Sequence, residues 1–159
     1  MARKTRELII NEGDDDMVFV IKQMPATQAE AWLARVALLV LGSSAQVPDS
    51  AGIGEATKHL VANGLGALSG LSYDKVKPLY DELLSCIDRV LPDGGMKAVD
   101  VRTIDGYISN PASIIKMRFA AFEANIDFFG YGETLTSIKA NALKAVSPST
   151  QTSPVSAVS

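Results

Sequence analysis

Hydrophobic and polar positions follow two different periods along this chain, a strand-like one near the N-terminus and a helical one over most of the rest. Two runs rich in β-branched residues, 7–11 and 17–23, flank a polar segment, 12–16, that contains Gly13. This arrangement predicts a β-hairpin over residues 7–23. The three aspartates of the turn lack the spaced pattern of a calcium loop, so we interpret them as part of a solvated turn.

A helix is predicted over about residues 27–42, shortly after Pro25. Thr27 and Glu30 have the spacing of a capping box, in which each side chain satisfies a backbone amide at the helix start. The apolar residues of this segment recur at spacings of three and four and so share one face. They are Ala29, Trp32, Leu33, Val36, Leu39 and Val40. We expect Trp32 to anchor the core.

Two more helices are predicted over about residues 53–71 and 73–91. The first is rich in glycine, and its pattern leaves open whether the glycines allow close packing or break the helix. The second has a clean amphipathic stripe but contains Pro78. We expect a kink or a restart there, because proline lacks an amide donor. After a turn, alternation over residues 99–103 predicts a short strand.

A fourth long helix is predicted over about residues 111–129. Asn110 followed by proline is typical of a helix start, and Gly130 is a natural C-terminal stop. One continuous apolar face runs along the helix. It consists of Ile115, Phe119, Phe122, Ile126 and Phe129.

These elements together predict a mainly α protein, in which an N-terminal β-hairpin is followed by a bundle of four to five helices. The bundle and hairpin form a single globular domain over residues 1–145, and a short fifth helix falls near Leu135 to Ala142. Residues 146–159 carry no charge and are dominated by serine, threonine and proline. We expect a disordered tail there, because this composition buries too little apolar area to offset the entropy of ordering.

Composition narrows the classes of protein that fit. The chain has 159 residues, is 47% hydrophobic and carries a formal net charge of -3. This mildly acidic balance lacks the basic bias of a typical nucleic-acid binder. No apolar run approaches the roughly 20 residues of a membrane span, and no signal-peptide core follows the basic N-terminus. We therefore expect a cytoplasmic protein that binds neither nucleic acid nor membranes.

The residues that usually carry catalysis are few. His59 and Cys86 are the only histidine and cysteine, so a multi-cysteine zinc site and a metalloprotease motif are excluded. Both lie within predicted helices, whereas a nucleophile usually lies where a turn or helix start activates it. The glycine-rich segment 64–70 lacks the lysine of a phosphate-binding loop. We expect no enzyme, no cofactor and no metal.

Aromatic residues concentrate between residues 107 and 131, where six of the ten occur. A core stripe accounts for most of them. Phe128, however, is adjacent to Phe129 and so points away from it. An exposed aromatic cluster would bind another protein chain. We predict four partner-binding residues in this cluster: Phe122, Phe128, Phe129 and Tyr131.

Two segments resemble a family of tailed-bacteriophage tail assembly chaperones. The first is 24–35, Met-Pro-Ala-Thr-Gln-Ala-Glu-Ala-Trp-Leu-Ala-Arg, where a short β segment ends in a proline and leads into a helix bearing Glu-x-Trp. The second is 77–84, Lys-Pro-Leu-Tyr-Asp-Glu-Leu-Leu. With the segment between them, the resemblance covers roughly residues 17–91.

This resemblance implies a non-enzymatic assembly factor of the infected bacterial cytoplasm that is absent from the mature virion. Such chaperones bind the phage tape measure protein, keep it soluble and help recruit tail tube subunits. A longer form made by translational frameshifting is a further expected partner, and the sequence leaves self-association into a homo-oligomer open. Two alternatives stay open as well, a minor structural protein of the virion and a small enzyme with an unrecognised site.

Overall fold

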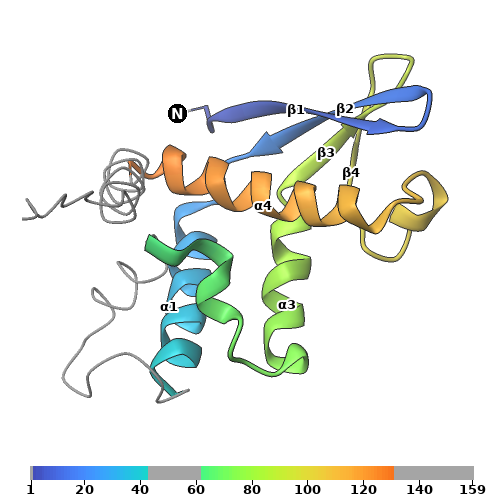
Figure 1. Ribbon diagram of the computed structural model, residues 1–159. Coiled ribbons are helices and arrows are strands. Elements are labelled where there is room, and N and C mark those ends of the chain that lie inside the picture. Colours follow the sequence, from blue (N-terminus) through green and yellow to red (C-terminus); the bar gives the residue numbers. More distant parts are fainter. Residues whose placement is uncertain (1, 43–61, 131–159) are drawn as a thin grey trace, which may run out of the picture.

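The computed structural model describes residues 2–42 and 62–130. In these ranges the elements are β1 (Thr5–Glu12), β2 (Asp15–Lys22), α1 (Ala26–Gly42), the 3-10 helix η1 (Gly64–Leu68), α3 (Tyr73–Leu84), β3 (Ile87–Val90), β4 (Met96–Ala98), the 3-10 helix η2 (Ile104–Gly106) and α4 (Pro111–Phe128). The strands form one antiparallel sheet in the order β1-β2-β3-β4. Helix α4 runs across one side of the sheet, and α1 and α3 lie on the far side of α4 (Figure 1).

The N-terminal hairpin is present; β1 extends further than predicted at both ends, and β2 begins two residues earlier than predicted and ends at Lys22. They pair from Thr5 with Lys22 to Glu12 with Asp15, so the turn contains only Gly13 and Asp14. Gly13 has a φ of +68°, a conformation that costs any residue with a Cβ atom free energy. Glycine at this position is what makes so short a hairpin turn accessible.

The predicted bundle of four to five helices is wrong. The described residues form a four-stranded antiparallel sheet and three α-helices instead. The largest error lies in the predicted helix 73–91, because α3 ends at Leu84 and, after two connecting residues, Ile87–Val90 form β3. Ile87 is fully buried opposite Ile21 of β2. Pairing with β2 satisfies the backbone of this β-branched segment and decides in favour of a strand.

The strand predicted over residues 99–103 is also wrong, since β4 occupies Met96–Ala98. Asp100 then accepts a hydrogen bond from the backbone N of Arg102 at 2.8 Å. Such a local side-chain bond stabilises a turn in place of a continuing strand. The predicted helix 53–71 is wrong over residues 64–71, where Gly64 has a φ of +57° and the 3-10 helix η1 is followed by a turn. Residues 53–61 lie outside the described residues.

The helix starts and stops compare unevenly with prediction. Helix α1 begins at Ala26, so Thr27 lies within its first turn and does not form a capping box with Glu30. Helix α3 continues through Pro78 without a restart. Both ends of α4 are confirmed: the Asn110 side chain accepts from the backbone N of Ala112, and Gly130 follows the helix at a φ of +83°.

Trp32 anchors the core, as predicted. Its side chain is 3% exposed, and its indole Nε1 donates a hydrogen bond to the carbonyl of Leu79 at 3.1 Å. Its ring lies 6.1 Å from that of Phe122, centroid to centroid. Helices α1, α3 and α4 therefore meet at this one side chain. The wider core joins them to the inner face of the sheet through Ile10, Phe19, Ile21, Ile87 and Met117.

Candidate functional site

The apolar face of α4 is divided into a covered half and an open half. Phe122 and Ile126, in the C-terminal half, are 3% and 6% exposed because α1 and α3 pack against that end of the helix. Ile115 and Phe119, in the N-terminal half, are 53% and 46% exposed. The face that the sequence spacing predicted as one stripe is thus half core and half surface.

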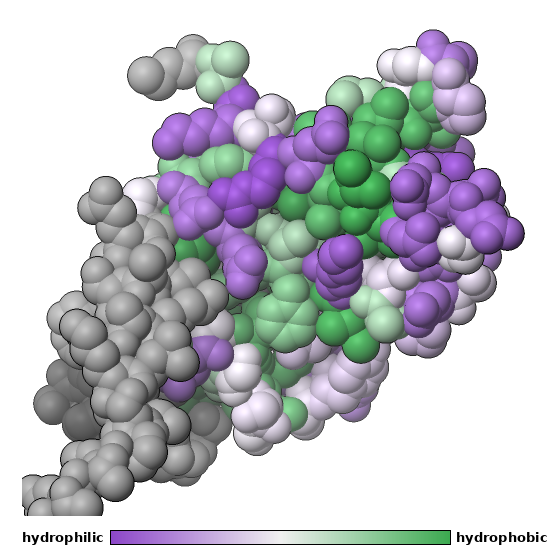
Figure 2. Space-filling model, turned by 45° about the horizontal axis from the view of Figure 1, so that its top comes forward, coloured by the Kyte–Doolittle hydropathy of each residue, from purple (hydrophilic) through white to green (hydrophobic). Residues whose placement is uncertain are grey.

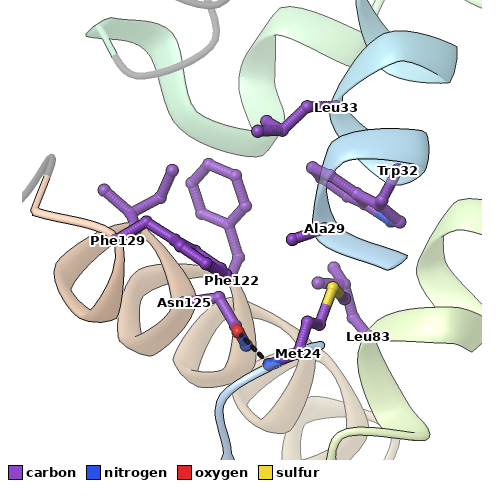
Figure 3. Close-up of a pocket in the computed structure, with 9 residues that line it drawn as sticks. Met24, Ala29, Trp32, Leu33, Leu83, Phe122, Asn125 and Phe129 are labelled. Atoms are coloured by element: carbon purple, nitrogen blue, oxygen red, sulfur yellow. Dashed lines mark hydrogen bonds between the residues drawn. The ribbon is translucent and has the colours of Figure 1, made fainter. Parts of the chain in front are cut away.

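A small apolar pocket lies at the covered end of this face, between the start of α1, α3 and the end of α4 (Figure 3). Its volume is about 30 Å³. Phe122, Phe129, Trp32 and Leu33 surround the space, and Met24, Ala29, Leu83, Asn125 and Ile126 complete the wall. Small-molecule sites usually measure roughly 300–1,000 Å³. The pocket therefore suits the tip of one apolar side chain better than a cofactor.

The only polar side chain in the pocket wall is already satisfied. Asn125 Oδ1 accepts from the backbone N of Met24 at 2.8 Å, and its Nδ2 donates to the carbonyl of Ala121 at 2.9 Å. Asn125 thereby fixes the segment before α1 to α4 (Figure 3). Because both polar atoms of this side chain are engaged within the fold, the pocket recognises shape and apolarity.

The four predicted partner-binding residues do not form one cluster. Phe122 and Phe129 come together in the wall of the pocket, with Phe122 buried and Phe129 half-buried. Phe128 is half-buried towards β1, where the guanidinium of Arg6 lies 5.6 Å from its ring. Tyr131 lies outside the described residues. Phe122 is therefore part of the core and not of an exposed surface.

Sequence reasoning missed Ile115 and Phe119 as surface residues. Their spacing assigned them to the core with the rest of the stripe, and nothing in the local sequence shows how far α1 and α3 reach along α4. The sequence offers one signal of exposure: Lys116 and Glu123 are charged residues directly next to Ile115 and Phe122, two positions of the apolar stripe.

The N-terminal end of α4 is fixed to β1 by one carboxylate. Glu12 accepts hydrogen bonds from the backbone N and the Oγ of Ser109, at 3.1 and 2.9 Å, and from the Oγ of Ser113. The backbone N of Asn110 also donates to it at 3.3 Å. The bonds from Ser113 and then Ser109 lower the pKa of Glu12. A carboxylate at a helix N-terminus is also favoured by the helix dipole.

The C-terminal end of α4 is held by two basic residues, Arg6 of β1 and Lys4, the residue just before that strand. Lys4 Nζ donates to the carbonyl of Phe128 at 3.2 Å, and Arg6 forms an ion pair with Asp127 at 2.5 Å. Cations at a helix C-terminus complement its dipole. Helix α4 is therefore tied at both ends to β1, antiparallel to it, and presents Ile115 and Phe119 on a fixed support.

The described residues provide little for catalysis. Cys86 is 6% exposed, and burial raises its pKa to about 11, so the nucleophilic thiolate is scarce near neutral pH. His59 lies outside the described residues. Within residues 2–42 and 62–130 there is no group of three or more side chains suited to hold a metal ion. The same ranges contain no helix long and apolar enough to cross a membrane.

No protein-family model, curated protein or solved structure matches this chain. Segments 24–35 and 77–84 contact each other in the fold. Segment 24–35 forms the start of α1, segment 77–84 forms most of α3, and the bond from Trp32 to Leu79 joins them. Met24, Trp32 and Leu83 from these segments all line the pocket.

Proposed function

We propose that this chain is a tail assembly chaperone of a tailed bacteriophage, which binds the tape measure protein without catalysing a reaction. The observation that supports this best is the open half of the apolar face of α4, Ile115 and Phe119, on a helix fixed at both ends. The resemblance of residues 24–35 and 77–84 to such chaperones supplies the identity of the partner.

The physical basis of the proposal is protection of apolar helix faces. A tape measure protein is expected to be long and helical, and its apolar faces aggregate when they are left bare. An amphipathic helix binds a complementary apolar surface through side chains spaced by three and four residues. Ile115 and Phe119 offer two such contacts, and the pocket beside Phe122 accepts the tip of a third side chain.

The remaining parts of the proposal follow from the same role. A chaperone that holds the tape measure protein soluble acts in the cytoplasm of the infected host and leaves before the tail is complete. It also brings tail tube subunits to the tape measure protein, and a longer frameshifted form of the chain is a further partner in that step. Each of these is open to direct test.

The decisive experiment is co-expression with the tape measure protein of the same phage. We expect the wild-type chain to raise the soluble fraction of the tape measure protein and to co-purify with it. The double variant Ile115→Ser, Phe119→Ser should lose both effects while keeping the wild-type melting temperature. Leu38→Ser is the matched control, because Leu38 is 64% exposed but lies on α1.

Three outcomes would count against the proposal. If the tape measure protein is equally soluble with and without this chain, the chaperone function fails. If Leu38→Ser is as damaging as the double variant, the site on α4 is wrong. If mass spectrometry finds the chain in purified mature virions at stoichiometric amounts, a minor structural protein is the better description.

A further inference from the structure

Strand β1 forms one edge of the sheet and leaves half of its backbone groups without a strand partner. The backbone N of Gln23 donates to the carbonyl of Lys4 at 2.9 Å, which sets the alternation of the β1–β2 ladder. The N–H and C=O groups of Thr5, Glu7, Ile9 and Asn11 therefore point away from β2. Such an edge is a template for another strand.

The side chains along this edge leave it open to approach. Residues 5, 7, 9 and 11 are all exposed, and Ile9 is 51% exposed. Ile9 lies opposite Val18, and Glu7 opposite Val20, so these residues share the sheet face that points away from the core. In the upper part of the view in Figure 2, apolar side chains gather beside a band of hydrophilic ones.

The charges on the hairpin are polarised along β1. Its N-terminal end carries Arg3, Lys4 and Arg6, and its other end leads into the acidic residues Glu12, Asp14 and Asp15. A parallel second strand with the same sequence would set like charges together. An antiparallel one sets each basic end against the acidic turn of the other copy, which is the favourable arrangement.

We propose that β1 pairs antiparallel with β1 of a second copy of this chain across a two-fold axis, which joins the two sheets edge to edge. With Ile9 on the axis opposite its own counterpart, Glu7 lies opposite Asn11 of the second copy. Beyond the ladder, the exposed basic residues Arg3 and Lys4 then lie beside the turn residue Asp14 of the second copy, which Asp15 follows at the start of β2. In this register the outward backbone groups of residues 7, 9 and 11 all gain partners.

One side chain has to move for this pairing. Lys116 Nζ donates to the carbonyl of Ile9 at 3.5 Å, from the edge side of α4. The same side of α4 carries Asp127 near its other end, paired with Arg6 of β1. Across a two-fold axis the lysine half of one α4 approaches the acidic half of the other. Lys116 thereby loses its hydrogen bond to the carbonyl of Ile9 and comes close to the acidic half of α4 in the second copy.

The pairing covers few residues, so the dimer is weak and reversible. Interfaces well below about 1,000 Å² belong to transient complexes, and we expect dissociation constants of roughly 10 µM to 1 mM. This inference does not depend on the proposed chaperone function, because it uses the edge of β1 and not the apolar face of α4.

A charge-swap experiment tests both the pairing and its direction. Sedimentation equilibrium should show about tenfold or more weaker dimerisation for Arg3→Glu, Lys4→Glu and likewise for Asp14→Lys, Asp15→Lys. An equimolar mixture of the two double variants should restore dimers, because each acidic end then meets a basic one. A wild-type chain that stays monomeric at millimolar concentration, or a mixture that shows no recovery, overturns the proposal.

A second experiment tests the backbone contact. Ile9→Pro removes an N–H that points away from β2, which an edge strand tolerates, and it should abolish dimerisation. Ile9→Thr keeps that N–H and should still dimerise.

If Ile9→Pro does not fold by circular dichroism, cysteine cross-linking replaces it. Ile9→Cys should form disulfide-linked dimers, whereas Val20→Cys, one strand further in, should not. Linked dimers from Val20→Cys would mean stacked sheet faces and overturn the edge pairing.

Discussion

Phe119 and Phe122 are three residues apart on α4, yet one faces solvent and the other lies in the core. Phe122→Ala should therefore lower the free energy of unfolding by about 3–5 kcal/mol, since it leaves a cavity beside Trp32. Phe119→Ala should change it by less than about 1 kcal/mol. Urea denaturation followed by circular dichroism measures both values. Equal losses for the two variants would mean that both phenylalanines are buried in solution.

Glu12 makes the stability of the protein depend on pH. Its hydrogen bonds to Ser113 and Ser109 lower its pKa from the ordinary 4.5, so the ionised form stabilises the native state above that pH. This contribution is lost as the pH falls through the lowered pKa. We expect the melting temperature of the wild type to fall more steeply below pH 4.5 than that of Glu12→Gln.

The matched control for this prediction is Glu30→Gln, which removes an exposed carboxylate on α1. It should leave the acid slope of the wild type unchanged. If Glu12→Gln keeps the full slope as well, the hydrogen bonds at the start of α4 do not set the acid sensitivity.

At the scale of elements, the two-residue turn between β1 and β2 depends on one glycine. Gly13→Ala should destabilise the protein by about 1 kcal/mol or more, because alanine is strained at a φ of +68° even though the space around it is open. Gly66→Ala is the control. Gly66 has open space and no positive φ, so alanine should be neutral or slightly stabilising there. Thermal unfolding compares the two, and equal shifts would contradict the argument.

The elements that could be predicted from the sequence are those whose limits are set locally. The hairpin has a glycine turn between two β-branched runs, and α4 has Asn110 at one end and Gly130 at the other. The helix predicted over 73–91 failed because no glycine or proline separates α3 from β3. Leu83 and Ile87 are four residues apart, which fits a helix, and only the distant β2 strand makes Ile87 part of a sheet.

In the candidate site, too, local spacing predicts some features, whereas tertiary packing sets the others. The spacing of residues 115–129 correctly placed Phe122 and Ile126 on one apolar face, and the spacing within 27–42 correctly placed Trp32 in the core. Exposure of Ile115 and Phe119 depends on how far α1 and α3 extend along α4, which is set by tertiary packing. Phe128 turned towards Arg6 of β1, a contact between residues more than a hundred positions apart.

At the scale of the whole molecule, β2 and β3 are neighbours in the sheet but are separated in sequence by α1 and α3. Helix α4 packs on β1, β2 and α3, so hairpin and helices share one core. We expect amides of β2 and the core face of α4, such as those of Ile21 and Met117, to show the same opening free energy in native-state hydrogen exchange. Lys97, in the three-residue edge strand β4, should exchange faster.

The opposite result would also be informative. If the β1–β2 hairpin keeps its protection when α4 amides have already exchanged, hairpin and helices open as separate units. The ties of Lys4, Arg6 and Glu12 to the ends of α4 would then be too weak to couple the hairpin to the rest of the molecule.

Because Cys86 is buried, the rate at which its thiol is labelled reports how often this part of the protein opens. With a pKa of about 11, the thiol has roughly a thousandth of its molecules ionised at pH 8. Cys86 lies in the connection between α3 and β3, where it is 6% exposed and its Sγ lies 3.5 Å from the carbonyl of Glu82. Alkylation by iodoacetamide therefore waits until that junction separates. Cys86 is the only cysteine. The labelling rate, followed by mass spectrometry, therefore measures how often β3 separates from α3. Full labelling within the time needed for an unfolded chain would show that the junction is already open in the native state.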